Sequence, residues 1–196
     1  MRSLKIAAAA ALAVLALTSA SFAGVVLFDF ESGSQGWGSF GVPTTDSGVL
    51  PEGSVGQGRY HAFQADLGGW GIIDVSPLGL DLTPYTGFSV DARLVDIAGY
   101  PPYAGPKNVD IGIGLPDESE FYAAPVTLTS SYQTYAVNLA DFVPAGTNLA
   151  NVQIKLRILM GAGTAGVGRF DYDQITAVPE PAALVLLGLL ALLRRR

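Results

Sequence analysis

The sequence contains no cysteine and only one histidine, His61. Without cysteine the chain forms no disulfide and carries out no thiolate chemistry. A single histidine argues against histidine-based zinc chemistry, and neither a Gly-x-Ser-x-Gly motif nor a phosphate-binding loop is present. The sequence therefore predicts a protein that is not an enzyme. Its stability is expected to come from packing of apolar side chains, with a bound metal ion as a possible second source.

Cationic side chains are scarce away from the ends of the chain. The whole chain has 11 Lys plus Arg and 17 Asp plus Glu, which gives a net charge of −6. Five of these cations (Arg2, Lys5 and Arg194 to Arg196) and one acid (Glu180) lie in the two end segments, so residues 24–177 have a net charge of −10. Because nucleic-acid binding needs clustered cations, we exclude nucleic acid as a partner.

Helical periodicity is also missing from residues 24–177, where apolar residues instead alternate with polar ones. The clearest inward-facing sets are Phe88, Val90, Ala92 and Leu94; Val109, Ile111, Ile113 and Leu115; and Val152, Ile154, Leu156, Ile158 and Met160. Turn residues separate about nine such short strands, whereas residues 33–58 are rich in Gly, Ser, Thr and Pro and are predicted to be mostly loop with short strands at best. This pattern predicts an all-β fold, a β-sandwich, because antiparallel sheets have one buried and one wet face.

Residues 1–23 have the features of a secretory signal peptide. Arg2 and Lys5 precede an apolar run from Ile6 to Leu17, and small residues stand at 21 and 23. Signal peptidase is therefore an expected partner, with cleavage before Gly24. Residues 24–177, 154 in number, are long enough for a single domain with its own core.

The C-terminal segment, residues 178–196, combines three features in a fixed order. Val178, Pro179, Glu180 and Pro181 form an expected extended motif, an apolar run follows at 182–193, and three arginines end the segment. Twelve helical residues span roughly 18 Å against a hydrocarbon core of about 30 Å, so this short transmembrane helix is a poor permanent anchor. Arginines favour the cytoplasmic side of a membrane. A generic tail anchor is the alternative interpretation.

This order of motif, short helix and basic stop resembles the PEP-CTERM sorting tail. The resemblance implies an exosortase-type processing enzyme as partner, attachment to the inner membrane before processing, and a final location at the cell surface or in the extracellular matrix.

Several short motifs of residues 24–177 resemble bacterial carbohydrate-binding modules of the galactose-binding-like jelly-roll type. They are Phe28-Asp29-Phe30-Glu31 followed by Gly36-Trp37, Tyr132-Gln133-Thr134-Tyr135 before Asn138 to Phe142, and Phe170 to Ile175. The resemblance implies a structural calcium ion that joins the first strand to the last. Glu31 and Asp173 stand at the corresponding positions, Asp171 could assist, and carbonyls of residues 32–36 would complete the oxygen ligands. A solvated carboxylate edge is the alternative for this cluster.

A candidate ligand surface follows from the outward positions of the clearest strands. These positions hold Asp91, Arg93, Asp110, Gln153, Lys155 and Arg157. If their strands are neighbours, these groups converge on one polar surface. Gly112 and Gly114 would leave that surface shallow. An aromatic platform for a sugar could come from Trp70, Tyr100 or Tyr103 on adjacent loops. Ordinary cross-strand charge pairs are the alternative. Trp37 is expected to be a core or loop anchor.

Three functions remain open from the sequence. The first is an exported non-catalytic β-sandwich that binds glycans or adheres in an exopolysaccharide matrix. The second is a structural matrix or surface-layer component without a specific ligand. The third is a polysaccharide-active enzyme, for which the clustered carboxylates Asp117, Glu118 and Glu120 lie in a predicted turn, where solvated charge is the simpler explanation.

Overall fold

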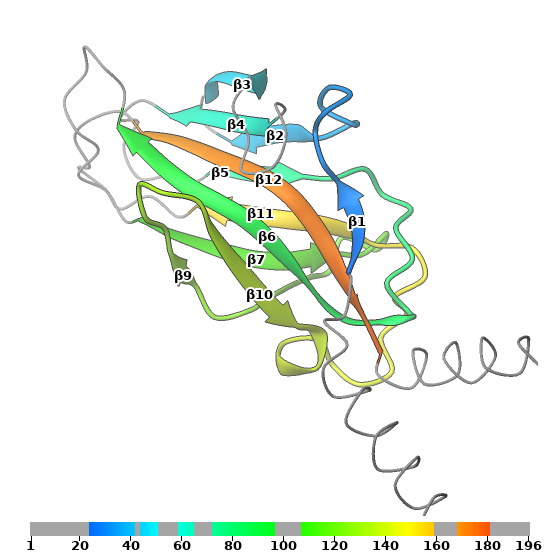
Figure 1. The fold of residues 1–196 in the computed structure, drawn as a ribbon. Helices are drawn as coiled ribbons and strands as arrows, with labels where there is room; N and C mark the ends of the chain where they lie inside the picture. The colour runs from blue at the N-terminus through cyan, green and yellow to red at the C-terminus, as the bar shows by residue number, and fades with distance from the viewer. Residues whose placement is uncertain are drawn as a thin grey trace, which may run out of the picture.

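The computed structural model describes residues 24–41, 44–50, 59–64, 72–96, 107–158 and 168–180 (Figure 1). The predicted signal peptide, Trp70, Tyr100, Tyr103 and residues 181–196, with the predicted helix at 182–193, lie outside these ranges. Within the described ranges, no helix has the length and apolar character needed to cross a membrane.

The described residues form two antiparallel sheets packed face to face, as the alternation predicts. Sheet A has the order β10-β6-β12-β4-β3, with β1 also paired to β12, and sheet B has the order β2-β5-β11-β7-β8, with β9 also paired to β7. The strands of sheet A are β1 (Val25–Phe28), β3 (Thr44–Leu50), β4 (Arg59–Gln64), β6 (Tyr85–Asp96), β10 (Gln133–Asn138) and β12 (Gly168–Pro179). Those of sheet B are β2 (Gly38–Gly41), β5 (Ile72–Val75), β7 (Asn108–Gly114), β8 (Glu120–Tyr122), β9 (Val126–Thr127) and β11 (Gln153–Ile158). A short 3₁₀ helix, η1 (Leu139–Asp141), follows β10.

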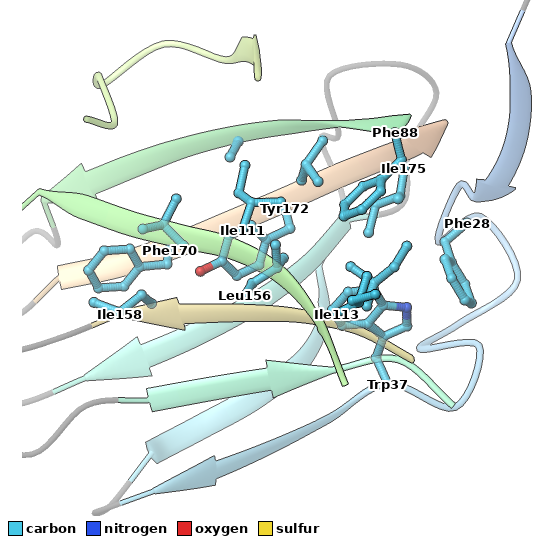
Figure 2. Close-up of a cluster of buried hydrophobic side chains, with 14 of the residues drawn as sticks. Phe28, Trp37, Phe88, Ile111, Ile113, Leu156, Ile158, Phe170, Tyr172 and Ile175 are labelled. Carbon is cyan, nitrogen blue, oxygen red and sulfur yellow. The ribbon is translucent and has the colours of Figure 1, made fainter. Parts of the chain in front are cut away.

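The core lies between the two sheets and is built from the predicted inward-facing residues (Figure 2). Every second residue of β6 and β11 is buried, because side chains alternate between the faces of a strand. The fully buried side chains include Phe88, Val90, Ile111, Ile113, Ile154, Leu156, Ile158 and Phe170. Trp37 is buried as an anchor, as predicted, with its ring edge-on to Phe28 at 5.4 Å and to Phe30 at 5.8 Å between centroids.

A β-bulge at Gln174 changes which residues of β12 face the core. Phe170 and Tyr172 point inward before it, whereas Ile175 and Ala177 are the buried residues after it. The extra residue adopts a positive φ of 26° and interrupts the pairing with β6. Asp171 therefore lies on the opposite face from Tyr172, yet both side chains are completely buried.

One detail differs from the sequence-based expectations. The described part of segment 33–58 contains β2, a short strand as expected, and β3 (Thr44–Leu50), which with seven residues is longer than the short strands predicted there. Residues 120–128 contain two short strands, β8 and β9, and residues 123–125 between them belong to neither. Pro125 lacks the backbone donor that a continuous strand needs there.

Candidate functional site

The predicted polar surface is divided between the two outer faces of the sandwich. Asp91 and Arg93 are on β6, in sheet A, whereas the other predicted residues are on β7 and β11, in sheet B. Because the sheets pack face to face, their outward side chains point in opposite directions. The structure therefore does not bring Asp91 and Arg93 together with Asp110, Gln153 and Arg157. Alternation shows which residues share one strand face, but it does not show which sheet the strand joins.

The outer face of sheet A carries two arginines held by one carboxylate. Arg93 Nε donates to Asp171 Oδ2 at 2.8 Å, and Arg169 donates to the same carboxylate through Nε at 2.8 Å and Nη2 at 3.2 Å. The Asp171 side chain is fully buried, whereas each arginine side chain is 21% exposed. Asp171 and Arg93 stand directly opposite each other in the β12–β6 register, which explains why the pair forms.

An aromatic ring and a second polar pair extend this group along β10. The Arg93 guanidinium lies over the ring of Tyr132, 4.3 Å from its centroid. Thr134 Oγ1 donates to Asp91 Oδ1 at 2.6 Å, because the two residues are register partners. We call the set Arg93, Arg169, Asp171, Tyr132, Asp91 and Thr134 face A.

The arginines of face A keep hydrogen-bonding capacity for an external acceptor. Among the described residues, Arg93 donates a hydrogen bond only through Nε, and Arg169 leaves Nη1 unused. Each guanidinium has five N–H groups in a fixed plane. Asp171 thus fixes the orientation of two planar donor groups that a hydroxyl-rich or anionic ligand can approach.

On the outer face of sheet B, charged and aromatic side chains bind one another. Arg157 donates to Asp110 Oδ2 through Nε at 3.0 Å and Nη2 at 2.8 Å, and its guanidinium lies 3.9 Å from the ring centroid of Tyr122. Glu120 accepts hydrogen bonds from Lys155 and, at 2.9 Å, from Tyr122. We call the set Asp110, Arg157, Tyr122, Glu120 and Lys155 face B.

Side chains fill the hollow that two glycines were predicted to leave on face B. A Cβ at Gly112 would lie 2.5 Å from a Tyr122 ring carbon, so this ring rests on the glycine. At Gly114 the same atom would meet the Lys155 side chain at 2.5 Å. The Tyr122 ring is therefore covered by Arg157 and packed against Gly112, and it offers no open face to a ligand.

Two of the three clustered carboxylates, Asp117 and Glu120, are bound by neighbouring side chains or backbone groups. Asp117 accepts a hydrogen bond from the Ser119 backbone at 3.1 Å, and its contacts with Ser119 lower the pKa of the Asp117 carboxyl. Partial burial of Glu120 opposes ionisation, but the bonds from Lys155 and Tyr122 still hold the pKa of Glu120 below its ordinary value. Burial and the contact with Glu120 raise the pKa of Tyr122, so it stays protonated.

The predicted calcium ligands differ in environment. Glu31 is exposed, whereas Asp171 and Asp173 are buried. Asp171 is bound by two guanidiniums, and the described residues contain no group of three or more Asp, Glu, His or Cys side chains suited to a metal ion. A calcium ion at this place would therefore take most of its oxygens from main-chain carbonyls, and the site stays a prediction.

Loop 29–36 is closed by one side chain. Gln35 Nε2 donates to Asp29 Oδ1 at 2.7 Å, and Gln35 Oε1 accepts from the Asp29 and Phe30 backbone at 3.2 Å. This amide bridge holds Phe30 at a φ of 55°. No sequence pattern predicted this bridge between Gln35 and Asp29.

A buried carboxyl group inside the sandwich was missed by the sequence analysis. Asp74 of β5 accepts a hydrogen bond through Oδ1 from Ser39 of the neighbouring strand β2, and its carboxyl group lies near the Tyr172 hydroxyl of sheet A. Burial raises the pKa of Asp74 from its ordinary 3.8 to about 7, and the contacts with Ser39 and Tyr172 counteract part of that rise. The residue stood in a short apolar run, Ile72 to Val75, without a regular alternation to indicate its direction.

Comparison with known proteins indicates the fold. No protein-family model and no curated protein matches the chain. A family 11 carbohydrate-binding module from Clostridium thermocellum, solved in complex with a β-1,3-1,4-mixed-linked tetrasaccharide, is similar with a TM-score of 0.52 and 19% identity over 79% of this chain and 95% of that chain. A family 28 carbohydrate-binding module specific for non-crystalline cellulose matches with a TM-score of 0.53 and 16% identity over 79% and 94%.

A similar match falls within an enzyme. The β-1,2-glucanase from Parabacteroides distasonis has a TM-score of 0.53 and 15% identity over 80% of this chain but 25% of that chain. At these identities the likeness concerns the fold. The chain thus has the β-sandwich fold found in carbohydrate-binding modules.

Proposed function

We propose that this protein is an exported, non-catalytic β-sandwich that binds glycans through face A and carries a PEP-CTERM-type sorting signal. Its proposed place is the cell surface or the extracellular matrix, after attachment to the inner membrane and processing by an exosortase-type enzyme. The binding part rests on the fold shared with carbohydrate-binding modules and on one observation: Asp171 holds Arg93 and Arg169 beside Tyr132 on a single face.

Face A is favoured over face B because it has two guanidiniums around one carboxylate, whereas face B has one guanidinium. Sugars are recognised by planar hydrogen-bonding groups beside apolar or aromatic surface. Among the described residues, Arg93 and Arg169 both keep N–H groups that bind no acceptor, whereas on face B the Tyr122 ring is covered by Arg157 on one side and packed against Gly112 on the other. Asp91 adds a carboxylate that can accept from sugar hydroxyls.

The two faces provide a matched pair of variants. Arg93 and Arg157 are each bound to one aspartate and stacked on one tyrosine, on opposite sides of the sandwich. We expect Arg93→Met to weaken retention on a binding polysaccharide about tenfold, since one or two hydrogen bonds to sugar are lost. Arg157→Met should retain wild-type binding.

The measurement is affinity electrophoresis in gels that contain mixed-linkage β-glucan, amorphous cellulose or polysaccharide from the producing cells. Near-ultraviolet circular dichroism checks that both variants are folded. Equal retention of Arg93→Met and wild type on a polysaccharide that binds would refute face A. Failure of the wild type on every polysaccharide would favour a structural matrix component.

The sorting and non-catalytic parts are tested separately. The combined Pro179→Ala, Glu180→Ala and Pro181→Ala variant is expected to accumulate as an unprocessed membrane-bound form, and release at wild-type size would contradict the sorting signal. Incubation of the purified domain with the same polysaccharides should release neither reducing ends nor unsaturated sugars. Release of either product would establish an enzyme instead.

A further inference from the structure

The first three residues of the sorting motif belong to the folded domain. Val178 and Pro179 are the last residues of β12, where Val178 pairs with Gly87 and Pro179 with Tyr85. The Val178 carbonyl accepts a hydrogen bond from Thr86 Oγ1 at 3.3 Å. The domain therefore continues past residue 177, where the sequence pattern placed its end.

Proline would normally interrupt such a ladder, because it has no N–H group. The pairing register shifts between Val178 and Pro179, and the backbone resumes its contact one residue later, where Glu180 N donates to the Pro84 carbonyl at 3.2 Å. The motif is thus attached to β6 before its first proline and to Pro84, the residue that precedes β6, after it.

The solvent exposure of the motif changes along its length. Val178 and Pro179 are half-buried, whereas Glu180 is exposed. Glu180 borders a cavity of about 260 Å³ with Tyr85 and Leu139. In the folded domain an external protein can reach the Glu180 side chain, while Val178 O and Glu180 N are engaged by the domain itself.

The end of β12 has fewer neighbours than the rest of that strand. Residues 168–172 lie between β6 and β4, and residues 175–177 lie between β6 and β1, where the last β1 pair joins Val25 to Ala177. Among the described residues, Val178 and Pro179 have strand pairing to β6 alone. A strand end with one neighbour opens more readily than the doubly paired part, so the natural opening point lies between Ala177 and Val178.

We propose that Val178 to Glu180 form a strand end that must detach from Tyr85 to Gly87 before a peptide-reading processing enzyme binds the motif. Enzymes that read extended peptides do so largely through main-chain hydrogen bonds, which are the groups that β6 occupies here. Folding of the sandwich therefore competes with processing. This inference rests on the sorting part of the proposed function.

An insertion separates the motif from the sheet without changing the motif. We insert Gly-Ser-Gly-Ser between Ala177 and Val178 in the full chain, so that the inserted residues take the positions opposite Tyr85 to Gly87. Precursor conversion in a pulse-chase experiment in the producing cells should become about threefold faster or more, because opening is no longer required. The control carries the same insertion after Glu118, an exposed residue of the turn between β7 and β8. It should be processed at the wild-type rate.

A single substitution tests the contact directly. Thr86→Val removes the hydroxyl that binds the Val178 carbonyl and keeps the side-chain shape. It should accelerate both processing and hydrogen exchange of the Glu180 amide, measured on the full chain in detergent. Thr127→Val, which removes a threonine hydrogen bond to Asn108 elsewhere on the domain, is the control and should change neither.

The outcomes distinguish this inference from the sorting proposal. If the wild type is processed in a motif-dependent way and both the 177/178 insertion and Thr86→Val leave the rate unchanged or lower it, the strand-end inference is wrong and the sorting signal stands. If wild type and the triple alanine variant are processed alike, the sorting proposal is wrong and the inference falls with it.

Discussion

The carboxyl group of Asp74 in sheet B meets the hydroxyl group of Tyr172 in sheet A at the centre of the sandwich. Both side chains are fully buried, and the Tyr172 ring lies among the apolar residues that fill the space between the sheets (Figure 2). The two groups form a buried polar pair between the sheets, where either group alone would be unfavourable.

The first prediction concerns pH. Burial raises the pKa of Asp74 to about 7 in the folded state, against 3.8 for an ordinary aspartate. Between these values the folded protein binds a proton that the unfolded chain has lost, so stability should fall as pH rises from about 4 to about 7 and change little above that. Each pKa unit corresponds to about 1.4 kcal/mol, which places the whole effect at a few kcal/mol.

Urea unfolding of residues 24–180 across this pH range measures it. Asp74→Asn should remove most of the slope because the amide does not titrate, while Asp117→Asn, in an exposed turn, should keep it. A wild-type protein whose stability rises over the same range would contradict the prediction.

The second prediction concerns the partner of that carboxyl group. Tyr172→Phe removes one hydroxyl and leaves Asp74 with less hydrogen bonding in a buried place. We expect a loss of about 1–3 kcal/mol in the free energy of unfolding at pH 7. Tyr135→Phe removes a partly exposed hydroxyl bound to the Thr127 carbonyl at 2.9 Å and should cost less than about 1 kcal/mol. Equal losses for the two variants would show that the Asp74 contact adds nothing.

The third prediction compares the two arginine-binding aspartates. Asp171→Asn leaves two largely buried guanidiniums without their anion and should reduce stability by about 2–4 kcal/mol. Asp110→Asn affects one arginine that is 30% exposed and should cost about 1 kcal/mol. Chemical denaturation gives both values. Only Asp171→Asn should also weaken polysaccharide retention, because it releases the donors of face A.

The fourth prediction tests calcium. An ion bound between Glu31 and Asp173 at a hundredfold excess over its dissociation constant should stabilise the domain by about 2.7 kcal/mol, which raises the melting midpoint by several degrees. Chelator and Asp173→Ala should each abolish this rise. If the melting midpoint is the same with calcium and with chelator, the domain binds no stabilising calcium ion and the prediction is wrong.

Much of the fold could be predicted because alternation is a local property. Phe88 to Leu94 and Val152 to Ile158 have their inward and outward residues where the sequence placed them. Thr44–Leu50 was missed because Thr-Thr-Asp-Ser-Gly has no apolar period. The register of β12 could not be read either, since the bulge at Gln174 reverses the alternation within a single strand.

The site was predicted less well, because it depends on which strands become neighbours. Arg93 and Arg157 have the same local pattern but lie on opposite faces. Asp171 was considered as an oxygen ligand for a cation, and it is bound to cations of a different kind, the side chains of Arg93 and Arg169. Tyr132 was named only as part of a motif that resembles carbohydrate-binding modules, whereas its ring supports the Arg93 guanidinium.

The position of β12 also determines how the domain transmits force. This strand runs antiparallel to β6 from Gly168 to Pro179 and is flanked on its other side by β4 and then β1 (Figure 1). Tension applied from the C-terminal side acts along the strand, so the hydrogen bonds of the ladder are sheared together and are not opened one after another. Consider a protein that is held by its C-terminal segment while it binds a polymer. After the short end at Val178 has detached, it would unfold only when all hydrogen bonds of the remaining ladder break together. Its lifetime under tension is then set by the unfolding rate.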